Sequence, residues 1–141
     1  MTVKELSQLY WLQREIDLDM KRLRELEAAA ASPKGQKVDD MPRSPGHDDA
    51  LARMVAEIVD LQAIIEAKRQ KCIRERNRLE RYISGIDDSL TRQVFLYRFV
   101  DGLSWIDVAS RITCDSGKDH TEYAVKKRCY RYLREQNKKN Q

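Results

Sequence analysis

The chain has 141 residues, of which 41% are hydrophobic and 35% charged, and its formal net charge is +4. This balance is too apolar for a disordered tail and too charged for one thick globular core, so it indicates an extended helical protein. The longest uncharged stretch is far shorter than the roughly 18 to 20 residues of a membrane span, and the N-terminus has no apolar signal region. We therefore expect a cytoplasmic protein without membrane association.

The cysteines do not indicate a disulfide or a metal site. There are three, Cys72, Cys114 and Cys129, and no two of them have C-x-x-C spacing. An odd number without this spacing is typical of reduced thiols in the cytoplasm. His120 lies between Cys114 and Cys129 in the sequence, but this spacing matches no known zinc geometry. We therefore expect neither a bound metal nor a cofactor.

Glycine and proline divide the chain into five predicted helices. All three prolines lie between Ser32 and His47, and no Gly or Pro falls inside a segment with helical periodicity. The first predicted helix extends from about Thr2 to Ala31 and is amphipathic. Its apolar residues recur at three- and four-residue steps and are Leu9, Leu12, Ile16, Met20, Leu23 and Leu26.

The second predicted helix is capped by Asp48 or Asp49 and continues to about Ile86. It is roughly 50 Å long at about 1.5 Å per residue, and it is apolar on one stripe only. This stripe must pack against the first helix as an antiparallel hairpin, against another copy of the chain, or against both. The spacing is the heptad pattern of a coiled coil, with Lys68 and Glu75 as polar interruptions. The apolar members are Leu51, Met54, Ile58, Leu61, Ile65, Cys72, Leu79, Tyr82 and Ile86.

Two polar segments in this part of the chain have alternative interpretations. The loop contains Met41-Pro-Arg-Ser-Pro-Gly-His47, which is either a recognition motif or, the favoured interpretation, a plain connection between helices. The second helix carries a basic run interleaved with Glu66, Glu75 and Glu80, and a salt-bridged surface is favoured over an additional phosphate contact. The basic residues are Lys68, Arg69, Lys71, Arg74, Arg76, Arg78 and Arg81.

Two short helices are predicted after Gly85. Asp87 or Asp88 is the expected cap of the first, which ends near Val100 and is stopped by Gly102 in a left-handed C-cap. Ser104-Trp-Ile-Asp107 is a capping pattern that starts a helix of about eight residues. The apolar faces comprise Leu90, Val94, Phe95, Tyr97 and Phe99 in the first helix, and Trp105, Val108, Ala109 and Ile112 in the second.

The last predicted helix follows a polar stretch from Thr113 to His120. It begins at Thr121, or at Asp119 with Glu122 three residues later, and ends near Gln136. Two helices joined by a turn, with a supporting helix before them, are typical of a helix-turn-helix unit. The predicted fold is therefore all-α. Residues 1–84 form a coiled-coil helical hairpin with a Pro/Gly-rich loop at 32–48, and residues 85–141 form a helix-turn-helix domain.

Charge indicates what the last helix contacts. Residues 121–141 contain seven Lys or Arg and two Glu, a net charge of +5, whereas residues 84–120 have a net charge of −2. A basic helix beside a slightly acidic support is typical of proteins that bind a DNA groove, and a solvated basic tail is the alternative. An apolar face of Val125, Cys129, Tyr132 and Leu133 lies opposite the basic one. The predicted DNA-binding residues are Tyr123, Lys126, Lys127, Arg128, Tyr130, Arg131 and Arg134.

Catalysis has no support in the sequence. We find no Gly-rich phosphate loop, no nucleophile elbow and no H-E-x-x-H motif. Asp87 and Asp88 form an adjacent carboxylate pair, but a helix cap accounts for them more simply. We therefore expect no enzymatic activity and no catalytic residue.

The helix-turn-helix segment carries a resemblance to known proteins. The segment Leu103-Ser-Trp-Ile-Asp-Val-Ala-Ser-Arg-Ile112, followed by Val125 and Arg131-Tyr-Leu133, resembles region 4 of sigma factors. With the N-terminal hairpin, the Met41-Pro-Arg43 loop and Gly85-Ile-Asp-Asp88, the chain is similar to small prophage-encoded proteins of Gram-positive bacteria. That family is grouped with phage transcriptional regulators of the late-operon activator type. The resemblance implies a positioning helix at 104–112 and a recognition helix at 121–133. The turn at 113–120 is longer than the three to four residues usual in such units.

These features together predict a sequence-specific double-stranded DNA-binding protein, a transcriptional regulator of a phage or prophage. The alternative is a structural nucleoprotein, such as a small phage DNA-packaging subunit, whose coiled coil builds a ring. The expected partners are duplex DNA and further copies of the chain, joined through the coiled coil. The resemblance to sigma factors also makes RNA polymerase a candidate third partner.

Overall fold

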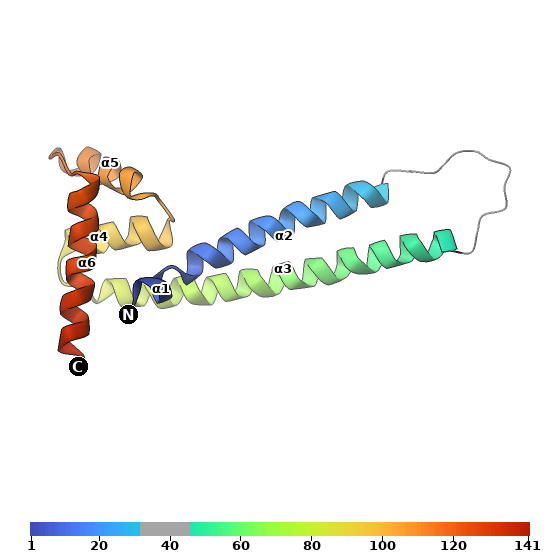
Figure 1. Ribbon diagram of the computed structural model, residues 1–141, viewed down its shortest axis with the longest axis horizontal. Helices are drawn as coiled ribbons and strands as arrows, with labels where there is room; N and C mark the ends of the chain where they lie inside the picture. The colour runs from blue at the N-terminus through green and yellow to red at the C-terminus, as the bar shows by residue number, and fades with distance from the viewer. Residues whose placement is uncertain (32–45) are drawn as a thin grey trace. The chain divides into compact units, whose positions relative to one another are not determined.

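The secondary structure of the described part of the chain consists of helices alone. The computed structural model describes residues 1–31 and 46–141, except for the side chains of 46–48, and contains no strand there (Figure 1). The predicted all-α fold is confirmed. No helix in these two ranges is long and apolar enough to cross a membrane. The helices are α1 (Val3–Leu6), α2 (Gln8–Ala31), α3 (Gly46–Ser84), α4 (Ser89–Phe95), the π-helical turn η1 (Leu96–Val100), α5 (Trp105–Ser116) and α6 (Glu122–Lys139).

The chain divides into two compact units. Unit 1 contains Met1–Leu12 and Cys72–Gln141, and unit 2 contains Gln13–Lys71. The boundary between the units falls inside α2 and inside α3, so one part of each helix belongs to unit 1 and the other part to unit 2. Unit 1 includes the predicted helix-turn-helix segment together with residues 1–12 and 72–84, because side chains from all three ranges share one apolar core.

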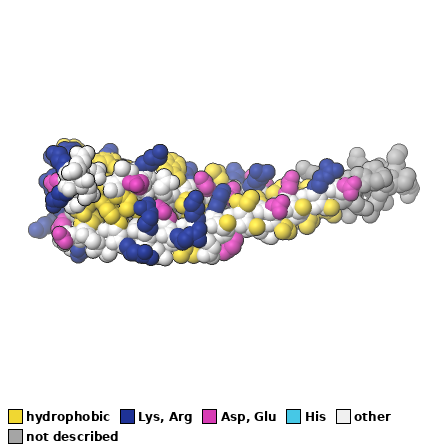
Figure 2. Space-filling view, turned by 90° about the horizontal axis from the view of Figure 1, so that it is seen from below, with side chains coloured by type: hydrophobic (Ala, Val, Ile, Leu, Met, Phe, Trp, Pro, Cys, Tyr) yellow, Lys and Arg dark blue, Asp and Glu magenta, His cyan; other side chains and the backbone are white. Residues whose placement is uncertain are grey.

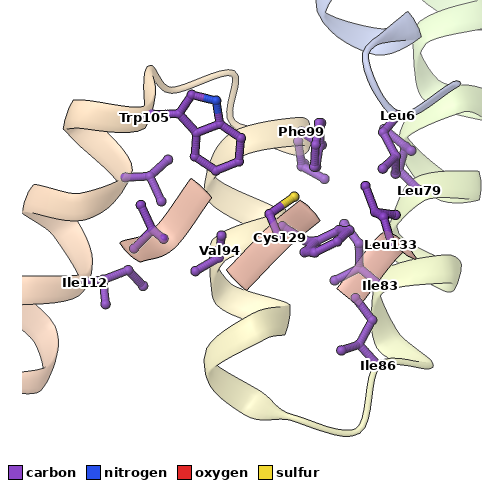
Figure 3. Packing of buried hydrophobic residues seen from close by; sticks show 14 of the residues in the cluster. Leu6, Leu79, Ile83, Ile86, Val94, Phe99, Trp105, Ile112, Cys129 and Leu133 are labelled. Carbon is purple, nitrogen blue, oxygen red and sulfur yellow. The ribbon is translucent and has the colours of Figure 1, made fainter. Parts of the chain in front are cut away.

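The core of unit 1 is built around α6. Figure 3 shows Cys129 between Val94 and Phe99, and Leu133 near Leu79 and Ile83. The first turns of the chain complete this core, since Leu6 and Leu9 are 0% and 1% exposed. Because the packing also draws on the N-terminus and on α3, the predicted helix-turn-helix segment does not supply the whole of its core. The buried members are Leu6, Leu9, Leu79, Ile83, Ile86, Val94, Phe95, Phe99, Val100, Trp105, Val108, Ala109, Ile112, Val125, Cys129 and Leu133.

In unit 2, α2 and α3 run side by side in opposite directions (Figure 1). Leu23 of α2 is buried together with Leu61 and Ile65 of α3. Beside this cluster, Lys68 donates to Asp19 at 2.6 Å and lies 3.6 Å from a Glu15 oxygen. The hydrogen bond to Asp19 raises the pKa of Lys68, which therefore stays charged. Lys68, the predicted polar interruption of the apolar stripe, thus forms an ion pair with α2.

The basic run on α3 is largely neutralised by neighbouring carboxylates. Arg69 pairs with Glu66 at 3.9 Å, Arg76 with Glu80 at 3.2 Å, and Arg78 with Glu75. These contacts, with the Lys68 pair, support the interpretation as a salt-bridged surface. Within the described residues, Lys71, Arg74 and Arg81 form no ion pair.

Before α5, the helices differ from the predicted ones in three places. The first helix is interrupted at Ser7, whose hydroxyl donates to the Val3 carbonyl at 2.8 Å and ends α1. Helix α3 begins at Gly46, so Asp48 and Asp49 lie inside its first turn and the prediction that one of them caps it is wrong. The segment from 96 to 100, predicted as ordinary helix, is π-helical. The motif from Met41 to His47 lies outside the residues whose side chains are described.

Candidate nucleic-acid interface

Helix α6 is tied to the start of α4 through a capping aspartate. Of the two predicted caps, Asp88 is the one observed, and Thr91 donates both its backbone N–H at 3.0 Å and its hydroxyl at 2.6 Å to Asp88 Oδ2. Arg128 Nη1 of α6 donates to the same oxygen at 2.9 Å. The hydrogen bonds from Thr91, and then the nearby Arg128 guanidinium, lower the pKa of Asp88. The carboxylate therefore links the capped end of α4 to the positive charge of α6.

Replacing Asp88 with Asn should lower the free energy of unfolding at pH 6 by about 0.5 to 1 kcal/mol, because Asn keeps the cap but loses the charge facing Arg128. The pKa of Asp88 is lower in the folded chain, so its stabilisation is present above the unfolded pKa of about 3.9 and is lost as the pH falls through the folded value. Urea titrations should therefore show the difference between parent and variant shrinking below about pH 4. A difference that is independent of pH would contradict this assignment.

The connection from α4 to α5 is held by a glycine and an arginine. Gly102 has a φ of 71°, as predicted for a left-handed C-cap. Arg98 Nη1 donates to the Leu103 carbonyl at 2.9 Å, and its guanidinium lies 4.8 Å from the centre of the Trp105 ring. Trp105 also meets Phe99 edge to face, with ring centres 6.5 Å apart. These contacts position the start of α5 on the end of the π-helical turn.

The turn between α5 and α6 is shorter than predicted. Helix α5 continues to Ser116 and ends on Gly117, which has a φ of 68°, so the connection is 117–121 and the predicted turn at 113–120 is wrong. Thr113 lies in the last part of α5, where its hydroxyl accepts from the His120 N–H at 2.9 Å and closes the turn. Thr121 then caps α6 by accepting from the Ala124 N–H at 3.1 Å. The first four residues of the polar stretch from Thr113 to His120 thus belong to α5, and only the remainder lies in the turn.

Helices α5 and α6 pack through the residues predicted to face inward. Trp105, Val108, Ala109 and Ile112 of α5 are all buried, as are Val125, Cys129 and Leu133 of α6. Burial raises the pKa of the Cys129 thiol to about 12, so this side chain is a neutral packing group at physiological pH. The two helices therefore form a packed pair, with one face of α6 turned inward and the other left for solvent.

The outward face of α6 is basic. The predicted residues Lys126, Lys127, Arg131 and Arg134 are exposed, and none forms an ion pair with another described residue. Tyr123 at the start of the helix is 72% exposed. Figure 2 shows Lys and Arg side chains (dark blue) at the surface of unit 1. Lys138 lies four residues beyond Arg134 on the same helical face and was not among the predicted residues, although its spacing places it there.

Two of the seven predicted residues have partners in the scaffold. Arg128 is half-buried and bonded to Asp88. Tyr130 is half-buried, and its ring centre lies 6.1 Å from that of Trp105 in α5. Their positions on α6 agree with the predicted helix faces, but both side chains contact neighbouring helices. The outward-facing set is therefore Tyr123, Lys126, Lys127, Arg131, Arg134 and Lys138.

Comparison of the chain with protein families, with curated proteins and with solved structures finds no match.

Proposed function

We propose that the protein binds double-stranded DNA in a sequence-specific manner, with α5 and α6 as the two helices of a helix-turn-helix unit. The observation that carries this proposal is the outward face of α6, where five cations form no ion pair with a carboxylate of the described residues. Like charges so close together repel one another unless an anion lies among them. The regularly spaced phosphates of DNA supply such an anion, and an α-helix fits the major groove.

The two halves of α6 would have different tasks in the groove. Residues near the start of a recognition helix reach base edges, whereas cations further along contact phosphates. Tyr123, Lys126 and Lys127 lie in the first two turns, and Arg134 and Lys138 in the last ones. Helix α5 supports this arrangement by holding α6 through its buried face. Sequence-dependent contacts are therefore assigned to the N-terminal half, and positioning contacts to the C-terminal half.

The biological role follows from the sequence resemblance. The similarity of residues 103–133 to sigma factor region 4, and of the chain to small prophage-encoded regulators, supports transcriptional regulation in a phage or prophage as the role. RNA polymerase is then a candidate partner of the same unit. Selection of bound sequences from random duplex DNA tests the first step, since a regulator recovers one motif and a nonspecific binder recovers none.

The protein is also proposed to act as a homo-oligomer. A dimeric helix-turn-helix protein binds two half-sites, and each copy supplies one recognition helix. The support in unit 2 is an exposed apolar stripe on α3 that α2 does not cover, and its first member, Leu51, also belongs to the predicted heptad pattern. Leu51, Val55 and Val59 lie at four-residue steps and are 50%, 48% and 57% exposed. Figure 2 shows apolar side chains (yellow) at the surface of this part of the chain.

Replacing both Lys127 and Arg131 with Ala should weaken duplex binding by about tenfold for each of the two side chains removed, while the fold is kept. Neither side chain belongs to the core, and the removal of one cation from a phosphate flattens the dependence of log affinity on log salt by about 0.9. Of the two cations, Arg131 lies in the C-terminal half of α6 that is assigned to phosphates, so the double variant should flatten the slope by about 0.9. Fluorescence anisotropy at several salt concentrations measures both quantities.

The matched control is the double replacement of Arg74 and Arg81 with Ala. These residues lie on α3 in unit 1, are exposed, and form no ion pair with a described residue. The control removes the same charge from the same unit but from outside α6. If both double variants show the same decrease in affinity and in salt slope, binding depends on overall charge and the assignment to α6 is wrong.

A further inference from the structure

The ring of Tyr123 has no packing role in the helix-turn-helix unit. It is the second residue of α6 and is 72% exposed, more than any other large hydrophobic side chain that is exposed in the described chain. Every other aromatic residue from 85 to 141 is buried or half-buried. Tyr130 and Tyr132 on the same helix contact the rings of Trp105 and Phe95. The exposure of Tyr123 is therefore not required by the fold.

The position of the ring on the outward face is defined by its neighbours. Lys127, one turn later, places its Nζ 5.6 Å from the centre of the Tyr123 ring, within reach of a cation–π contact. Thr121 caps the helix and fixes the first turn from which Tyr123 projects. The ring thus adds an apolar surface to the basic face at the N-terminal end of α6, the end that is assigned to base contacts.

We infer that Tyr123 is a specificity-determining residue that recognises a thymine through its 5-methyl group. This inference rests on the proposed function, because it assigns one contact within that DNA interface. Among the four bases only thymine presents a methyl group in the major groove, and apolar side chains contact it there. The neighbouring outward residues are cations, which suit phosphates and guanine acceptors. Tyr123 is the residue of this face whose surface is mainly apolar, so the methyl group is the base feature that it matches.

The test compares thymine with deoxyuridine, which lacks only the methyl group. A bound motif is first selected from random duplex DNA with the full-length parent protein. Each thymine of that motif is then replaced singly by deoxyuridine, and dissociation constants are measured for the parent, Tyr123→Phe and Tyr123→Ala. Burying one methyl group corresponds to a change of about fourfold in affinity. Circular dichroism confirms that both variants keep the parent's helix content.

The expected result is one thymine whose replacement weakens the parent and Tyr123→Phe by about fourfold but leaves Tyr123→Ala unaffected. Retention of the effect in Tyr123→Phe shows that the ring makes the contact, whereas its disappearance there would assign the contact to the hydroxyl and overturn the inference. The inference is also overturned if, at every thymine of the motif, deoxyuridine changes the affinity of Tyr123→Ala as much as it changes that of the parent. The proposed function would remain intact in that case. Absence of any duplex binding by the parent would refute the proposed function itself, and the inference with it.

Discussion

Replacing Val125 with Asp should unfold the packed pair of α5 and α6 and abolish the proposed duplex binding as a consequence. Val125 is 2% exposed and belongs to the core that α6 shares with α4, α5 and the N-terminal turns. An unpaired carboxylate in that position costs several kcal/mol, a large fraction of the roughly 5 to 15 kcal/mol that stabilises a domain. Thermal melts followed by circular dichroism, with near-ultraviolet spectra for the aromatic core, measure the destabilisation.

The neighbouring residue provides the control for this substitution. Ala124 is exposed and lies in the first turn of α6, where a carboxylate interacts favourably with the helix dipole. Ala124→Asp adds the same charge one position away. It should change the free energy of unfolding by about 0.5 kcal/mol or less, so the variant should melt within a few degrees of the parent. If Val125→Asp also melts at the parent temperature, the assignment of this residue to the core is wrong.

Leu61→Asp should break the packing between α2 and α3 in unit 2, at a cost of several kcal/mol to that unit. Leu61 and Leu23 are each 8% exposed and Ile65 is 2% exposed, so a carboxylate at 61 would replace the centre of a small apolar cluster. Hydrogen exchange followed by mass spectrometry should show reduced protection in 13–31 and 49–71. Protection in α4 to α6 should persist, because their core contains neither segment.

Val59→Asp is the control for this cluster and also tests the proposed oligomer. Val59 lies on the same helix but is 57% exposed, outside the contact with α2. The variant should keep the protection of both helices. If copies of the chain associate through the exposed stripe, light scattering should show that Val59→Asp lowers the molar mass to that of one chain. An unchanged mass above that of one chain would place the association elsewhere.

The local features of unit 1 were predictable from the sequence because each depends on residues within a few positions. The caps Asp88, Ser104 and Thr121 satisfy backbone N–H groups three residues later, and this spacing is visible in the sequence. The inward positions of α5 and α6 follow from a period of 3.6 residues, which separates the buried Val125 from the exposed Lys127 without knowledge of any partner. The basic composition of α6 was equally evident.

Periodicity identifies the buried side of a helix but not the segment that covers it, so the partners were decided only by the tertiary structure. The stripe on α3 packs with Leu23 in unit 2, whereas its last part enters the core of unit 1 together with Leu6 and Leu9. The position of Arg128 on α6 predicts a DNA contact, but its guanidinium bonds to Asp88, 40 residues earlier. The sequence by itself determined which faces are apolar and which are charged, through rules that act within one helix turn. Only the folded chain, by bringing distant segments into contact, decided which cations are neutralised within the protein and which remain on the outward face of α6.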